Sequence, residues 1–267
     1  MREQQQQEFS YLGFRRFYPE AMLCELVDCF WAIGGGQGLP PSSVEKLYPD
    51  GGCSLTFELG LQQATACFEF NRQTKTRQFF TQQPQISVRL YAGALFQLFR
   101  LSPTELPDHG CDATALLSGT MRQQLLLLLQ QLPDLSTAAA VASLEQWLIR
   151  LWLDSVGSAR TQAALQLLQQ SELNVAGTAA ELGISSRTLE RQLLQQVGLS
   201  PAYFQLCQRL KQARLRLAQT QQPLAQLALD LGFYDQAHFS HAFRDFVGET
   251  PASYRQRKLS QIYKAKN

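Results

Sequence analysis

The chain has 267 residues, of which 45% are hydrophobic and 17% are charged. This length favours two domains, and the composition excludes an intrinsically disordered chain. The longest apolar run, Leu125 to Leu129, is far shorter than the ~20 residues of a membrane helix. The Gln-rich start from Met1 to Glu8 lacks the apolar core of a secretion signal. We therefore expect a cytoplasmic protein without a membrane partner.

The formal charge of +2 is unevenly distributed along the chain. Residues 157–267 contain 13 Lys and Arg and 7 Asp and Glu, a net charge of +6. Residues 1–156 contain 11 Lys and Arg and 15 Asp and Glu, a net charge of −4. The basic half predicts a polyanionic partner such as nucleic acid, with an ordinary solvated basic face as the alternative.

Histidine and cysteine limit the chemistry of the chain. The three histidines are His109, His238 and His241, so residues 1–108 cannot hold a histidine-rich metal site. The six cysteines include no C-x-x-C pair, which favours free thiols over a redox or metal sensor. We expect no catalytic residue, no metal ion and no cofactor.

The segment 28–91 has the period of two that is typical of half-buried antiparallel strands. Loops are expected at 34–36 and 40–43, and a turn at Tyr48–Gly52, where Pro fixes φ and Gly permits a positive φ. The apolar alternation is clearest in three stretches, 55–59, 68–70 and 86–90. Several short strands with intervening turns predict a small β-barrel or a sandwich-like domain.

Two helices should follow the strands. One is predicted over 121–132 and ends at Pro133, and the other runs from the N-cap Ser136 to about residue 154. They either pack on their own domain or form the interface of a homodimer. Val156–Ser158 is the expected boundary between a sensor and dimerisation domain, 1–156, and an all-α domain, 157–267.

An internal repeat of about 50 residues dominates the C-terminal half. Gly183 corresponds to Gly232, and each glycine suits the left-handed end of a short helix. Ser185 and Asp235 are N-caps for the helices that follow. Apolar residues then recur every four positions, at Leu189, Leu193 and Val197 in one copy and at Phe239, Phe243 and Val247 in the other. Each copy, about 174–198 and 223–248, therefore reads as a helix-turn-helix unit that offers its second helix to a DNA major groove.

The polar face of each second helix provides the candidate DNA-binding residues. Arginine suits guanine and glutamine suits adenine, whereas neutral histidine is a weaker reader. The candidates are Ser186, Arg187, Thr188, Arg191 and Gln195 in the first unit, and Gln236, His238, Ser240, His241 and Arg244 in the second.

A single helix is expected between the units. Ser200 is its N-cap and Pro201 its first residue, and it runs to Thr220. Its roughly 18 residues span ~27 Å, which can hold the two units in successive major grooves, ~34 Å apart on one face of DNA. Candidate contacts to the DNA backbone are Arg209, Lys211, Arg214 and Arg216, together with Arg255, Arg257 and Lys258 beyond the second unit. For each of them an ordinary solvated charge is the alternative.

The segment from Leu231 to Phe243, followed by Gly248 to Arg255, resembles the AraC/XylS family of bacterial transcription regulators. The resemblance covers about residues 160–257. It implies a two-motif domain that binds double-stranded DNA, with Arg191 as a base-reading residue and RNA polymerase as a further partner. The chain departs from the family at His241, where arginine is common, and at Gly177, which interrupts the first helix of the first unit.

The N-terminal half resembles uncharacterised sensor-type domains that precede some of these DNA-binding domains, through segments such as Val27–Trp31 and Leu47–Gly51. This implies an unidentified small-molecule effector. A pocket for it could be lined by Trp31, Tyr48, Phe57, Phe68 and Arg89, although aromatic residues at strand spacing usually fill a core.

The sequence as a whole predicts an α+β protein of two domains that regulates transcription by sequence-specific DNA binding. One alternative is an enzyme with a barrel catalytic domain and a DNA-targeting module, which the absence of a nucleophile–base motif disfavours. Another is a nonspecific nucleic-acid-binding protein, which two rigidly spaced motifs disfavour.

Overall fold

The computed structural model describes residues 3–4, 13–34, 40–60, 63–154, 159–169 and 174–265. The expected domain boundary at Val156–Ser158 lies outside the described residues, as does all of Met1–Glu8 except Glu3–Gln4.

The N-terminal part is built on an antiparallel sheet. Seven strands pair in the order β1-β2-β3-β8-β5-β6-β9. They are β1 (Glu3–Gln4), β2 (Arg15–Phe17), β3 (Val27–Ile33), β5 (Cys53–Leu59), β6 (Ala64–Phe70), β8 (Gln85–Leu90) and β9 (Cys111–Asp112). Two further strands, β4 (Ser42–Leu47) and β7 (Lys75–Phe80), pair only with each other.

The arrangement is sandwich-like. Among the described strands the sheet does not close into a barrel, because β1 and β9 end it at opposite edges. A small apolar cluster fills the space toward the two-stranded ribbon: the ring of Trp31 on β3 meets Phe79 on β7 edge to face at 6.0 Å. The prediction of a loop at 40–43 is wrong for its last two residues, because Ser42 and Ser43 begin β4.

The predicted alternation is present in the main sheet. Leu55 and Phe57 on β5 are fully buried and lie opposite Phe68 and Ala66 of β6. Gly51 in the preceding turn has a φ of 81°, as the turn at Tyr48–Gly52 predicted.

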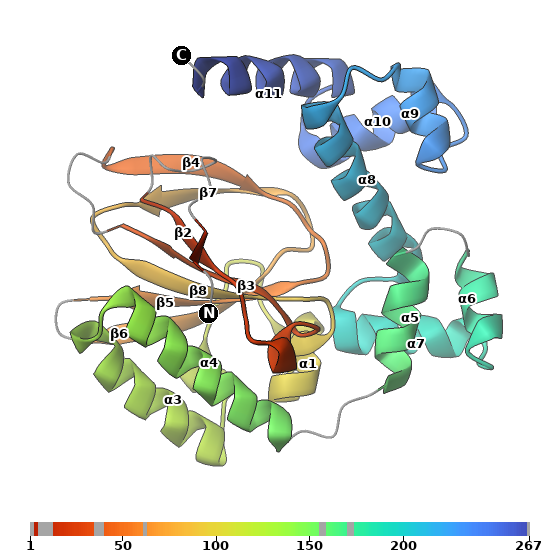
Figure 1. Ribbon diagram of the computed structural model, residues 1–267. Helices are drawn as coiled ribbons and strands as arrows, with labels where there is room; N and C mark the ends of the chain where they lie inside the picture. Colours follow the sequence, from red (N-terminus) through yellow and green to blue (C-terminus); the bar gives the residue numbers. More distant parts are fainter. Residues whose placement is uncertain are drawn as a thin grey trace.

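Both predicted helices of the N-terminal part are confirmed. α3 spans Gly119–Gln131, and α4 spans Thr137–Leu153 with the side chain of Ser136 accepting from the backbone N–H of Ala139. They lie side by side below the sheet (Figure 1), and the fully buried Trp147 of α4 packs against Phe99. Shorter helical segments are η2 (Ala21–Leu23), α1 (Ala94–Phe99), η3 (Pro103–Glu105), α2 (Ala113–Leu116) and η4 (Leu132–Asp134). The two helices thus cover their own domain.

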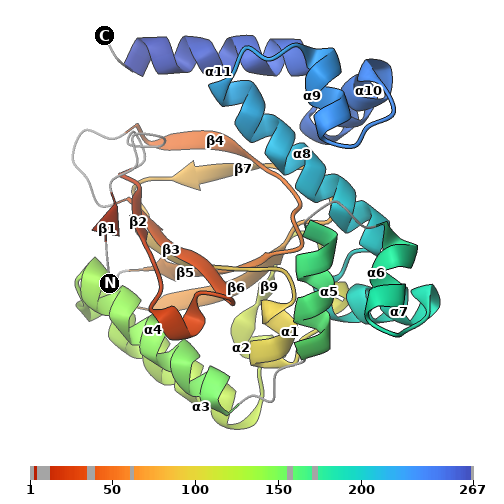
Figure 2. The same ribbon diagram turned by 45° about the vertical axis from the view of Figure 1, so that its right-hand side comes forward.

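The C-terminal part is helical. Its elements are α5 (Ala159–Gln169), α6 (Val175–Glu181), α7 (Ser186–Val197), α8 (Pro201–Gln219), α9 (Leu224–Asp230), α10 (Gln236–Val247) and α11 (Pro251–Ala265). The pairs α6–α7 and α9–α10 lie at opposite ends of α8 (Figures 1 and 2). None of the described helices is long and apolar enough to cross a membrane.

One apolar core joins the two parts. The same cluster of buried side chains includes Phe70 and Leu90 of the sheet, Val197 of α7 and Phe204 of α8. A Cβ at Gly198, just after α7, would lie 2.7 Å from Pro103 and 3.0 Å from Phe70. The helical part is therefore packed directly on the sheet domain.

Candidate nucleic-acid interface

The first helix-turn-helix unit has the predicted local chemistry. The turn after α6 passes through Gly183 with a φ of 64°. The side chain of Ser185 caps α7 by accepting from the N–H of Thr188 at 3.2 Å. Leu189, Leu193 and Val197 of α7 are fully buried, so the opposite face of this helix is turned to solvent.

The second unit repeats this geometry. Gly232 has a φ of 74°, and Asp235 accepts from the N–H of His238 at 2.7 Å. Phe239, Phe243 and Val247 are fully buried, as their counterparts in α7 are.

Gly177 does not break the first helix of the first unit. The side chain of Asn174 accepts from the N–H of Gly177 at 2.8 Å and caps α6. Gly177 therefore lies in the first turn of a helix that begins at Val175, where the N–H already has a partner in the cap.

The exposed face of α7 carries two arginines. Arg187 and Arg191 are exposed, and neither has a hydrogen bond or ion pair within the described part of the chain. Ser186 and Gln195 are also exposed and Thr188 is half-buried. A hollow of about 560 Å³ runs along this face, lined by Arg187, Thr188, Glu190, Arg191, Leu194 and Ser200. This face offers unpaired guanidinium groups to an anionic partner.

The exposed face of α10 is less basic than the sequence predicts. Asp245, which the sequence analysis did not single out, lies 3.0 Å from Nδ1 of His241 and 4.0 Å from Nε of Arg244. Its carboxylate offsets the positive charge of this face. Of the other candidates, Gln236 and His238 are exposed and Ser240 is half-buried.

The candidate backbone-contacting residues of α8 are engaged within the protein. Arg209 donates to the carbonyl oxygen of Gly232 at 3.1 Å and lies over the ring of Phe233 at 5.2 Å. Burial lowers the pKa of the Arg209 guanidinium. Arg214 lies 3.7 Å from the ring centroid of Tyr48 in the sheet domain. These two side chains make contacts within the protein, whereas the sequence suggested that they are exposed and contact DNA phosphates.

The remaining cations of this set differ: Arg216 and Arg255 have direct partners, whereas Lys211 is exposed and only lies near a carboxylate. Lys211 lies beside the carboxylate of Asp50 and faces the sheet domain. Arg255 donates to the carbonyl oxygen of Gln222 at 2.6 Å, and Arg216 lies 3.6 Å from Asp230. The basic excess of the C-terminal half is thus used in part to hold its own helices together.

The five residues suggested for an effector pocket do not come together. Phe57 and Phe68 are fully buried in the main core, and Trp31 belongs to the small cluster on β3. Tyr48 stacks on Phe246 of α10 with ring centroids 6.0 Å apart. Arg89 forms an ion pair with Asp50 and lines a cavity toward α8.

The sheet domain holds the carboxyl end of each second helix. The hydroxyl of Ser102 donates to the carbonyl oxygen of Gln195 in α7 at 2.6 Å. Lys46 and Thr74 donate to the carbonyl oxygens of Val247 and Phe246 in α10 at 2.8 and 2.5 Å. Cations and donors at a helix carboxyl end are stabilising because these carbonyls lack partners in the helix. No local sequence signal could have revealed these contacts, since each pair is separated by more than 90 residues.

Two capped helix-turn-helix units on one connecting helix define a class of DNA-binding domain. Comparison with known proteins is consistent with this class. Residues 178–257 match a helix-turn-helix domain family, and residues 15–112 match a domain of unknown function.

The named relatives include a transcriptional activator and an operon regulatory protein. The transcriptional activator RhaS of Pectobacterium atrosepticum is 37% identical over 103 residues, which cover 38% of this chain and 37% of RhaS. The arabinose operon regulatory protein of Escherichia coli is 33% identical over 88 residues, which cover 33% of this chain and 30% of that protein. A crystal structure of an AraC-type regulator from Chromobacterium violaceum is 31% identical, covers 37% of this chain and 91% of that one, and has a TM-score of 0.35.

The C-terminal part of the chain is therefore similar to the helix-turn-helix region of these regulators. The aligned segment spans less than two fifths of the length of each of the two named relatives.

Proposed function

We propose that this protein is a sequence-specific DNA-binding regulator of transcription. The observation that carries the proposal is the pair of helix-turn-helix units at the two ends of α8, each with its second helix exposed. α8 has 19 residues, or ~28 Å at 1.5 Å per residue, which suits units placed in successive major grooves.

The two units contribute unequally. The face of α7 presents Arg187 and Arg191 without internal partners, whereas the face of α10 pairs His241 and Arg244 with Asp245. We therefore assign most of the base reading to α7, with α10 as the weaker reader.

The test is a binding measurement with the full chain on DNA from upstream of its own gene and on random DNA of the same length. Arg191→Ala should lower affinity for the specific site by about 1–3 kcal/mol and relax the preference at one base pair. Arg122→Ala is the matched control, because Arg122 is exposed on α3 and far along the chain from both units.

An equal loss on specific and random DNA would contradict base reading by Arg191 and favour the nonspecific alternative. All measurements need the same salt concentration, because the release of counterions dominates affinity for DNA.

A small-molecule effector, a second copy of the chain and RNA polymerase are the further partners that we propose. The relatives are named as transcriptional regulators or activators, which disfavours the enzyme alternative. For homodimerisation, α3 exposes Leu126 and Leu127, at 39% and 58%. Sedimentation of the chain and of Leu127→Glu tests this contact.

A further inference from the structure

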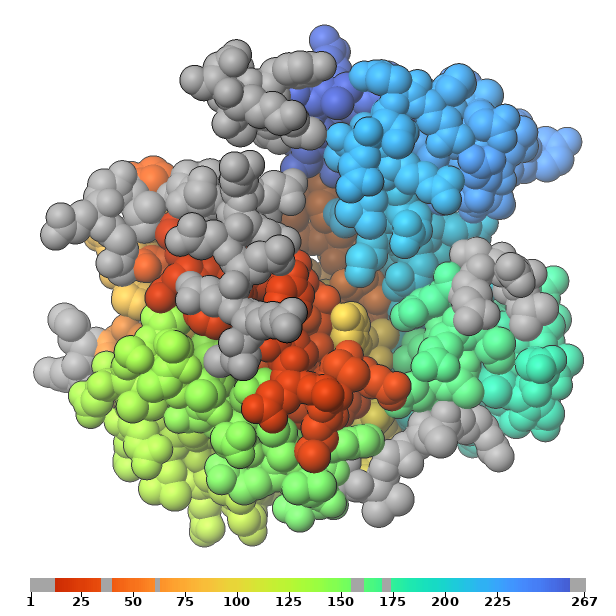
Figure 3. All heavy atoms as spheres, viewed as in Figure 1, coloured from red at the N-terminus to blue at the C-terminus, as the bar shows by residue number. Residues whose placement is uncertain are grey.

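A polar cavity lies between the sheet domain and the helical part. It encloses about 400 Å³, a volume within the range of small-molecule sites. The space-filling view shows the surface hollowed between the orange and yellow segments of the sheet domain and the green to blue helices (Figure 3). One wall comes from the turn at 50–52 and the end of β8, and the other from α5 and α8.

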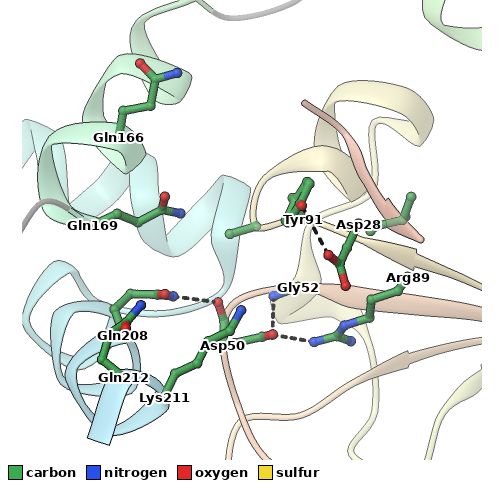
Figure 4. Close-up of a pocket in the computed structure, with 12 residues that line it drawn as sticks. Asp28, Asp50, Gly52, Arg89, Tyr91, Gln166, Gln169, Gln208, Lys211 and Gln212 are labelled. Carbon is green, nitrogen blue, oxygen red and sulfur yellow. Dashed lines mark hydrogen bonds and ion pairs between the residues drawn. The ribbon is translucent and has the colours of Figure 1, made fainter. Parts of the chain in front are cut away.

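The two walls differ in their charges. On the helical wall, Lys211 is exposed and makes no direct hydrogen bond or ion pair within the part of the chain that the structure describes. It reaches from α8 toward Asp50 and is flanked by Gln208 and Gln212 (Figure 4). Asp50 itself is already paired with Arg89 and accepts from the N–H of Gly52 at 2.9 Å. The ammonium of Lys211 is therefore the cation that remains open to a ligand.

The sheet wall offers an acceptor. The hydroxyl of Tyr91 donates to Oδ1 of Asp28 at 3.1 Å, and Arg16 holds Oδ2 of the same carboxylate at 3.1 Å. Asp28 keeps a side-chain exposure of 37% and lines the cavity (Figure 4). A carboxylate has about four lone-pair sites, so Asp28 can accept a further hydrogen bond.

We propose that this cavity binds a small organic acid that also carries a hydrogen-bond donor. The ligand carboxylate pairs with Lys211, and its hydroxyl or ammonium group donates to Asp28. Glutamine amides on α5 and α8 supply the remaining donors and acceptors. Hydroxy acids and amino acids share this chemistry.

The turn that lines the cavity also touches both DNA-reading units. Tyr48 stacks on Phe246 at the end of α10, and the backbone oxygen of Asp50 accepts from Gln208 at 3.3 Å. A Cβ at Gly51 would lie 3.0 Å from Val197 at the end of α7. A ligand between Asp28 and Lys211 therefore biases the placement of the two units relative to the sheet, and so changes the affinity for DNA. The change in DNA affinity rests on the proposed function, whereas ligand binding itself does not.

The first experiment is calorimetric titration of the full chain with two matched sets of acids. Propionate, lactate and alanine share a three-carbon skeleton, and succinate, malate and aspartate share a four-carbon one. Within each set the first acid lacks the donor, the second has a hydroxyl and the third an ammonium group. We expect saturable binding with a Kd below about 1 mM for at least one hydroxy or amino acid, and at least tenfold weaker binding of the acid without a donor.

Variants locate the site. Lys211→Gln should weaken binding by about 10- to 100-fold, because it removes a charge-assisted hydrogen bond. Asp28→Asn should erase the difference between acids with and without the donor. Arg122→Gln makes the same charge change on α3 and should bind like the parent. Circular dichroism establishes that each variant is folded.

Failure of all six acids to bind saturably, or binding that Lys211→Gln leaves unchanged, would overturn the proposal. A second titration measures DNA affinity with and without the acid that binds. Ligand binding without DNA binding refutes the proposed function alone, and DNA binding without ligand binding refutes the cavity site alone. DNA affinity that stays the same at saturating ligand would refute the coupling through the turn.

Discussion

Replacing Arg209 tests whether this side chain stabilises the fold or contacts a DNA phosphate. In the structure its guanidinium stacks on Phe233 at 5.2 Å and donates to the carbonyl oxygen of Gly232 at 3.1 Å, while the side chain is half-buried. Such a cation–π contact contributes about 1 kcal/mol, and a hydrogen bond from a charged donor contributes about 1–2 kcal/mol. Arg209→Ala should therefore lower the free energy of unfolding by roughly 2 kcal/mol, or the Tm by roughly 3–6 °C.

The assay combines urea unfolding with DNA binding across a range of salt concentrations. Each phosphate contact adds about 0.9 to the slope of log K against log salt. Because Arg209 is turned inward, Arg209→Ala should leave that slope unchanged. Arg209→Lys, which keeps the charge but loses the planar group, should also lower stability.

Arg187→Ala is the matched control for the surface of α7. Arg187 is exposed, so its replacement should leave the unfolding midpoint unchanged and should weaken DNA binding. The reasoning would be refuted if Arg209→Ala kept its full stability while its salt slope fell by about 0.9.

Three further predictions concern the turn at 48–52 and the cysteines. Gly51→Ala should cost about 1–3 kcal/mol in urea unfolding, because φ is 81° and Phe204 lies 3.1 Å from the added Cβ; unchanged stability would contradict this packing. Burial raises the pKa of the Asp50 carboxyl, but Arg89, Lys211 and the N–H of Gly52 outweigh it and hold the pKa below its usual 3.8. This carboxylate stabilises the fold above that pH and loses its effect as the pH falls below it, so Asp50→Asn should lose less stability than the parent as the pH is lowered below about 4. Burial raises the pKa of three thiols to about 12, those of Cys29, Cys53 and Cys207. A thiol reagent at pH 8 should modify the exposed Cys24 of the native chain well before these three, and equal rates would refute their burial.

The features that the sequence predicted well depend on neighbouring residues. Ser185 and Asp235 cap helices because the partner N–H lies three residues away, and Gly183 and Gly232 supply a positive φ directly. Apolar and polar residues alternate at 55–59, a pattern that requires only one buried face of the sheet. Such features can be predicted without knowledge of the rest of the fold.

The features that the sequence missed depend on distant residues. The loop predicted at 40–43 overlaps the start of β4, a polar strand of a two-stranded ribbon in which Val44 is 61% exposed. Arg214 is a candidate DNA contact in the sequence because it is a cation on the helix between the two units, but in the structure Tyr48 of the sheet domain covers it. An amphipathic pattern indicates which face of a helix is apolar and cannot show what covers the other face.

The apolar core runs without a break from the sheet to Tyr254 in α11. Val197 and Phe204 belong to the helical part in sequence, but their side chains pack in the same core as the sheet domain. Parts that share a core in this way are not interchangeable modules, because a foreign sheet domain would leave the end of α7 and the start of α8 uncovered. Recombination of this sheet domain with another helical part, in nature or by design, would need matching changes along the shared packing surface before either part could fold as it does here.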